Sequence, residues 1–116
     1  MSSTQNVIQN HLARFAAGDL DGLMADYSEE SVLFTPTGQL AGRSAIRGLM
    51  SGLFAEFAKP GARFALELLS VSGDVGFIVW SAETADQRYE FATDTFVVRG
   101  EKISHQSFAA KLGPRG

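Results

Sequence analysis

Apolar residues recur at helical spacing through the first half of the chain. Between residues 4 and 17 they stand three or four positions apart, and Gly18 supplies a C-terminal stop. Asp19 can cap a short second helix that ends near Ser28, with Tyr27 on its apolar face. A third helix is predicted after Ser44, a suitable N-cap, and its stripe consists of Ile46, Leu49, Met50, Leu53, Phe54 and Phe57.

Strand patterns fill the rest of the chain. Residues 31–35 favour a strand that Pro36 stops, and a turn follows. After Gly61 the pattern predicts four strands in an antiparallel meander, joined by short turns: 63–71, 75–83, 88–99 and 102–111. Helices first and strands later are typical of an α+β fold, and 116 residues suit a single domain over 1–116.

Composition narrows the class of protein. With 45% hydrophobic and 20% charged residues the chain has the balance of a globular domain, and its nine Phe suit a core with a cavity lined by rings. The net charge of −3, without a basic run, argues against a nucleic-acid partner. The chain contains no Cys, which excludes disulfides and thiolate chemistry.

Several other sequence signals are missing. Neither a leader pattern nor a stretch of eighteen apolar residues occurs, so we expect a cytoplasmic protein without a membrane partner, with export by an unlabelled route left open. The two histidines lack metal-ligand spacing, and we predict no metal site. No glycine-rich phosphate loop lies between a strand and a helix, and we expect no cofactor.

Six short segments carry a resemblance to a known group of proteins. They are residues 17–23 (AGDLDGL), 27–36, 42–47 (GRSAIR), 73–75, 94–96 and 100–103. Together they resemble the nuclear-transport-factor-2-like superfamily, within it the SnoaL-like and ketosteroid-isomerase-like branches. The resemblance implies a cystatin-like half barrel, in which three N-terminal helices pack on the concave side of a curved, mainly antiparallel sheet and enclose a pocket. It also implies a homodimer, but its members range from isomerases and cyclases to non-catalytic scaffolds.

Three positions can be compared with the ketosteroid isomerases of this group. Those enzymes place a base Asp directly before the proline that follows the first strand, where this chain has Thr35. Their helix-one Tyr corresponds to His11, and their protonated Asp on the penultimate strand corresponds to Asp94. Because only Asp94 matches, the resemblance disfavours steroid isomerisation by that mechanism.

Asp94 and His11 are the candidate catalytic residues. Alternation along the strand places Asp94 on one face with Ala92 and Phe96, so it is either a pocket acid or a carboxyl tied to backbone donors. In an apolar pocket its pKa would rise, and the neutral acid could donate a hydrogen bond to a substrate oxygen. His11 shares a helix face with apolar residues and is either a pocket donor or a core or rim residue.

Candidate ligand-binding residues lie on most of the predicted elements. Gln106 is expected to point inward and His105 outward, since neighbouring strand residues face opposite sides. Trp80 is either a pocket wall or a sheet-packing ring, and Thr35 either points its hydroxyl inward or serves packing alone. The predicted binding set is Tyr27, Phe34, Thr35, Phe54, Trp80, Phe96, Gln106 and Phe108.

Two functions from different classes stay open. One is a small-molecule enzyme of the SnoaL-like type, an isomerase or a cyclase or lyase working without metal, in which Asp94 assisted by His11 or Gln106 moves a proton on an apolar carbonyl compound. The other is a non-catalytic ligand-binding or dimerisation module. Both predict a small apolar ligand. The segment 75–80 is apolar on both faces, which predicts a homodimer through the outer sheet face.

Overall fold

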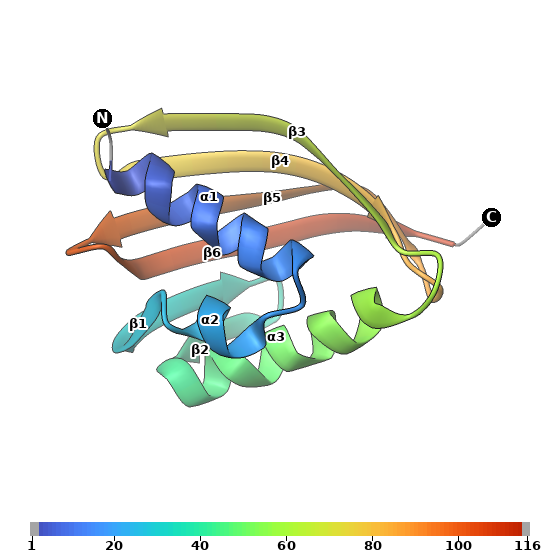
Figure 1. The fold of residues 1–116 in the computed structure, drawn as a ribbon, viewed down its shortest axis with the longest axis horizontal. Helices are drawn as coiled ribbons and strands as arrows, with labels where there is room; N and C mark the ends of the chain where they lie inside the picture. The colour runs from blue at the N-terminus through green and yellow to red at the C-terminus, as the bar shows by residue number, and fades with distance from the viewer. Residues whose placement is uncertain (1–2, 115–116) are drawn as a thin grey trace.

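Three helices and six strands make up the described part of the chain, residues 3–114, in this computed structural model (Figure 1). The helices come before or between the first strands, and the four longest strands follow. In chain order the elements are α1 Ser3–Ala16, α2 Leu20–Met24, β1 Tyr27–Thr35, β2 Gly38–Ala41, α3 Arg43–Ala58, β3 Arg63–Ser72, β4 Val75–Glu83, β5 Arg88–Arg99 and β6 Lys102–Gly113.

The six strands form one open sheet in the order β2-β1-β6-β5-β4-β3. Strands β3 to β6 are the predicted antiparallel meander, which is confirmed, whereas β1 pairs with β6 in parallel and makes the sheet mixed. The long strands arch over the helices, which all lie on the same side of the sheet (Figure 1). The predicted α+β architecture, with three helices packed on a curved and mainly antiparallel sheet, is therefore confirmed.

Alternation along the strands decides which side chains face the helices. On β4 the residues Ile78, Trp80 and Ala82 are buried, while Val75 on the opposite face is 43% exposed. On β5 the buried residues are Tyr89, Ala92, Asp94, Phe96 and Val98, and this strand contacts α1. The inner face of the sheet thus brings Trp80 and Asp94 beneath the helices.

The observed helix caps agree with the predicted ones at α2 but not at α3. Asp19 caps α2 as predicted, and its carboxylate accepts from the N–H of Gly22. The predicted N-cap Ser44 is wrong, because α3 begins after Gly42, whose φ of 89° lies in the region that favours glycine. The N–H of Gly42 donates to the carbonyl of Ser31, so this turn ties α3 to β1.

The second helix is shorter than predicted, and Tyr27 does not belong to it. Helix α2 ends at Met24, and Tyr27 is the first residue of β1, paired with Ile103 on β6. The N–H of Ile103 donates to the carbonyl of Asp26, which extends the sheet to this point. The sequence pattern also missed β2, a short and largely exposed edge strand that has no alternating apolar face.

Helix α3 carries its apolar stripe toward the sheet. Ile46 and Met50 are buried, and Phe54 is only half-buried, with its ring edge-on to that of Phe15 at 4.9 Å between centroids.

Within residues 3–114, no helix combines the length and the apolar character required to cross a membrane.

Candidate functional site

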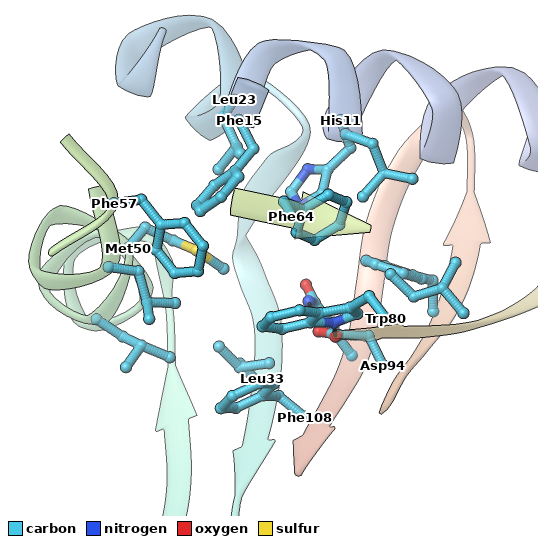
Figure 2. A pocket seen from close by; sticks show the side chains of 16 residues that line it. His11, Phe15, Leu23, Leu33, Met50, Phe57, Phe64, Trp80, Asp94 and Phe108 are labelled. Atoms are coloured by element: carbon cyan, nitrogen blue, oxygen red, sulfur yellow. Dashed lines mark hydrogen bonds between the residues drawn. The ribbon is translucent and has the colours of Figure 1, made fainter. Parts of the chain in front are cut away.

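A cavity of about 60 Å³ lies between the inner face of the sheet and helices α1 and α3 (Figure 2). Aromatic and aliphatic side chains form most of its wall, including the rings of Phe15, Phe57, Phe64, Trp80, Phe96 and Phe108. His11, Asp94 and Gln106 supply its polar groups apart from the Trp80 indole. Figure 2 shows His11 reaching in from α1 and Asp94 lying beside Trp80 on the sheet.

Asp94 is held by two side chains that also line the cavity. The indole N–H of Trp80 donates to Oδ1 at 2.8 Å, and the amide Nε2 of Gln106 donates to Oδ2 at 2.8 Å. The sequence left open whether this carboxyl faces a pocket or is tied to backbone donors. It lies at the cavity wall and its hydrogen bonds come from side chains, which favours the pocket acid.

Two opposing effects set the acidity of Asp94. Burial raises the pKa of its carboxyl, because the charged form loses its hydration. The hydrogen bonds from Trp80 and Gln106, together with the charge of His11, lower the pKa but do not cancel the effect of burial. The net pKa is therefore raised, in the direction that the apolar neighbours predict.

This raised pKa should make stability depend on pH. Below the unfolded-chain pKa of 3.8, Asp94 is protonated in both states and its stabilising contribution is fully present. As the pH rises toward the folded pKa, the unfolded chain has lost the proton that the folded protein still holds, so this contribution is lost. As the pH rises above about 4, we expect the free energy of unfolding of Asp94→Asn to increase relative to that of wild type. Urea unfolding of both proteins at several pH values checks this, and a constant difference would contradict it.

Tyr27 connects Gln106 to His11 beneath the cavity wall. Its hydroxyl donates to Oε1 of Gln106 at 2.5 Å and lies 3.4 Å from Nε2 of His11. Burial, followed by the negative charges of Asp94 and Asp26, raises the pKa of the Tyr27 phenol well above its ordinary value. The phenol therefore keeps its proton and serves as a hydrogen-bond donor.

The far side of His11 is fixed by an acid that the sequence pattern did not reveal. Asp26 places Oδ2 3.0 Å from Nδ1 of His11, and its Oδ1 accepts from Arg14 at 2.9 Å. His11 and Arg14 are three residues apart, a spacing that places them on one face of α1, and this was the available signal. Asp26 follows α2 and joins them only through tertiary packing, so its role could not be read from local spacing.

Half of the predicted ligand-binding residues line the cavity. Trp80, Phe96, Gln106 and Phe108 line it, and the rings of Trp80 and Phe108 stack at 6.1 Å between centroids. Gln106 faces inward and His105 is exposed, as strand alternation predicts. Tyr27 is buried and bonded to Gln106 but does not line the cavity itself.

Three predicted binding residues lie elsewhere. Phe34 is 41% exposed, because its neighbour Leu33 takes the inward position on β1 and lines the cavity. Thr35 is the last residue of β1, and its hydroxyl donates to the carbonyl of Gly38 at 3.0 Å. Phe54 packs against Phe15 outside the cavity wall. None of these three side chains lines this cavity, and their part in ligand binding stays a prediction.

The acidic side chains near the cavity are already engaged in hydrogen bonds and ion pairs. Asp26 is paired with His11 and Arg14, and both oxygens of Asp94 accept hydrogen bonds from Trp80 and Gln106. Among residues 3–114, no group of three or more His, Asp or Glu side chains is arranged to hold a metal ion. Asp94, Trp80 and Gln106 are thus bonded to one another, whereas His11 is bonded to Asp26 and Tyr27.

The fold and the cavity together define the class of protein. A curved open sheet, with three helices on one side and a buried acid in an apolar cavity, is an α+β domain of the cystatin-like kind. The sequence model of the SnoaL-like domain matches residues 8–106. The chain belongs to this SnoaL-like family, and the resemblance of its sequence segments is confirmed.

Solved structures share the same fold at low sequence identity. One is the epoxide hydrolase/cyclase-like enzyme SalBIII of pyran ring formation in the polyether salinomycin, with a TM-score of 0.81, 16% identity, and 97% of this chain and 95% of that chain covered. Another is a putative ketosteroid isomerase from Kribbella flavida, with a TM-score of 0.78, 12% identity and coverage of 98% and 82%. A third is a cystatin-fold protein from Novosphingobium aromaticivorans, with a TM-score of 0.74, 15% identity and coverage of 93% and 97%. A search of curated protein sequences found no significant match.

Proposed function

We propose that this protein is an acid–base isomerase or cyclase that acts on a small apolar molecule carrying a carbonyl group. One observation carries the proposal: the buried carboxyl of Asp94, whose pKa is raised by burial, lies at the wall of an otherwise largely apolar cavity. Catalytic acids and bases need pKa values shifted toward the working pH, and burial in a cavity is a usual way to achieve this. The surrounding rings suit an apolar ligand.

The chemistry follows from the two protonation states of Asp94. As a neutral acid it donates a hydrogen bond or a proton to the carbonyl oxygen of the ligand, and as a carboxylate it accepts a proton from an adjacent carbon. His11 reaches the same cavity from α1 and provides a second proton donor or acceptor. SalBIII is a cyclase-like enzyme and the Kribbella flavida protein a putative isomerase. Both share only the fold with this chain at their level of identity.

Ligand binding can be tested through a single indole. Trp80 is the one Trp of the chain and lines the cavity, so its fluorescence reports on occupancy. We expect saturable changes with small cyclic ketones and weaker changes with hydrocarbons of equal size, which lack a partner for Asp94. Native mass spectrometry of the purified protein tests for a retained small molecule. A protein that binds no ketone in the fluorescence titration contradicts the proposal.

A non-catalytic ligand-binding or dimerisation module is the second candidate function. The observation in its favour is the cavity volume of about 60 Å³. Ligand pockets usually measure roughly 300–1,000 Å³. A ligand of ordinary size would have to displace rings that line the cavity, such as that of Phe64. Phe64 is 41% exposed and lies on β3, the edge strand of the sheet. Binding without turnover would favour this candidate.

The outer face of the sheet supports a proposal about assembly. Val75 on β4 and Leu68 on β3 are 43% and 46% exposed, and Phe77 and Val79 lie half-buried on the same side. All three helices cover the other face, so this apolar surface would be buried by a second copy in a two-fold dimer. We expect light scattering at micromolar concentration to give the mass of a dimer, and Phe77→Lys to shift it to monomer. A monomer for wild type would contradict this expectation.

A further inference from the structure

Four side chains form a continuous line of hydrogen bonds along the cavity wall. The line runs from Asp94 to Gln106, from Gln106 to Tyr27, and from Tyr27 to His11. Its two ends, Asp94 and His11, line the cavity, whereas Tyr27 lies outside the wall. Two groups able to exchange protons with one ligand are thus also joined to each other through the protein.

The bonding capacity of each group makes the directions of these bonds interdependent. A carboxylate only accepts, the amide of Gln106 has one donor end and one acceptor end, and the Tyr27 hydroxyl has a single proton. In the present arrangement Gln106 donates to Asp94 and Tyr27 donates to Gln106. The Tyr27 oxygen is then free to accept, which suits a proton on Nε2 of His11, 3.4 Å away. This first state pairs ionised Asp94 with protonated His11.

The same line can be reversed without moving the backbone. If Asp94 is protonated, it can donate to Oε1 of Gln106 once the amide has rotated by half a turn, since the two ends of an amide have nearly the same shape. Gln106 then donates to the Tyr27 oxygen, and the Tyr27 hydroxyl donates to Nε2 of His11. This second state pairs neutral Asp94 with neutral His11. The line as a whole holds the same charge and the same number of protons in both states.

The surroundings of His11 determine which of its two ring nitrogens gains or loses a proton between the two states. Its Nδ1 faces Oδ2 of Asp26, whose other oxygen is paired with Arg14, so Nδ1 keeps its proton in both states. Its Nε2 faces Tyr27 on β1, and Phe96 on β5 lies edge-on to the ring. The titratable and charged groups around His11 are thus Asp26, Arg14, Tyr27 and, through its charge, Asp94. Only the Nε2 proton is left to vary.

From this geometry we infer that Gln106 and Tyr27 are positioning residues that couple the protonation of Asp94 to that of His11. The inference rests on the proposed function and narrows its reaction to proton shifts within one molecule. A ligand C–H bond breaks, its proton passes to Asp94 and its electron pair stays on the ligand. The Nε2–H bond of His11 breaks, and that proton forms a new bond at another ligand atom. The line then changes from the first state to the second, and proton exchange with water restores the first.

Nitrogen-15 NMR of the histidines tests this coupling without a substrate. The chain has two histidines, and the exposed His105 serves as an internal reference. Two-bond proton–nitrogen spectra give the ratio of protonated to unprotonated Nε2 in His11 at a fixed pH. Asn at position 94 imitates the neutral acid, so Asp94→Asn should lower this ratio by about tenfold, as for groups that interact by one pK unit. In a Tyr27→Phe background the same change should alter the ratio by less than about threefold, because only the through-space charge effect remains.

The outcomes separate coupling through the line from simple electrostatics. Equal effects of Asp94→Asn in the wild-type and Tyr27→Phe backgrounds overturn the inference, because a charge acting through space does not need the hydroxyl. Gln106→Met cuts the line at a second place and carries the test if Tyr27→Phe fails to fold. A protein that shows the coupling but binds no ketone would refute the proposed function alone. A protein that turns over a ligand but shows no coupling between Asp94 and His11 would refute only the inference.

Discussion

Replacing Asp94 with Asn is expected to lower the turnover of a carbonyl-bearing ligand by about 10²–10⁴-fold, the usual share of general acid–base catalysis. Asn has nearly the same shape, and its oxygen can still accept from the indole of Trp80, which donates to Oδ1 of Asp94 in wild type. Its NH₂ group meets the amide of Gln106, which can rotate to present its oxygen. The cavity is therefore kept, while the group that takes up and releases the proton is removed.

The comparison requires a ligand found through Trp80 fluorescence and a matched control. Asp74→Asn makes the same chemical change at an exposed turn residue between β3 and β4, and we expect it to turn over ligand as wild type does. The affinity of the Asp94→Asn protein should stay within about tenfold of wild type, because the ring lining is unchanged. If Asp94→Asn and Asp74→Asn turn over ligand equally, Asp94 has no acid–base role and the binding module becomes the better description.

The strand pattern predicted much of the cavity because side chains alternate strictly along a strand. On β5 this rule placed Asp94 inward with Phe96, and on β6 it placed Gln106 inward and His105 outward. Both strands lie in the middle of the sheet, where helices cover one face and the contrast between buried and exposed positions is strong. A two-residue period is enough to orient side chains under these conditions.

The same rule failed around β1, where the strand is irregular. The pairing of β1 with β6 shifts between Tyr27 and Val32, so the alternation seen later in the strand does not extend back to its start. Ser31 is buried there because its hydroxyl donates to the carbonyl of Ile103, a contact 72 residues along the chain. Tyr27 continues the apolar spacing of α2, and only the pairing with Ile103 makes it part of the sheet.

The link between His11 and Asp26 could not be predicted for a related reason. Asp94, Gln106 and His11 stand out as polar residues on apolar faces, which is a signal that a sequence can carry. Asp26 stands at the end of a short helix, where an acidic residue is unremarkable. Its link to His11 depends on how α1 lies across the start of β1, a matter of tertiary packing.

Truncating Ile8 to Ala is expected to lower the free energy of unfolding by about 2–5 kcal/mol, the range for buried large-to-small substitutions. Ile8 is fully buried on α1, directly over Gly76 on β4. A Cβ added at Gly76 would overlap Cδ1 of Ile8, so the absence of a side chain at Gly76 lets the helix approach the sheet. The loss matters for the site, since His11 follows Ile8 on the same helix. As a matched control, Leu66→Ala on β3 should cost less, because Leu66 is 43% exposed.

A double-mutant cycle between Ile8 and Gly76 tests whether this contact is what positions the helix. Gly76→Ala alone should destabilise by about 1–3 kcal/mol through overpacking, and Ile8→Val alone by about 0.5–1.5 kcal/mol through the lost methyl group. Together the two changes exchange one methyl group for another in the same space, so the double variant should lose less than the sum of the single variants. Denaturant unfolding of the four proteins gives the coupling. Strictly additive costs would show that Gly76 does not set the distance between α1 and β4, and that the position of His11 depends on other contacts.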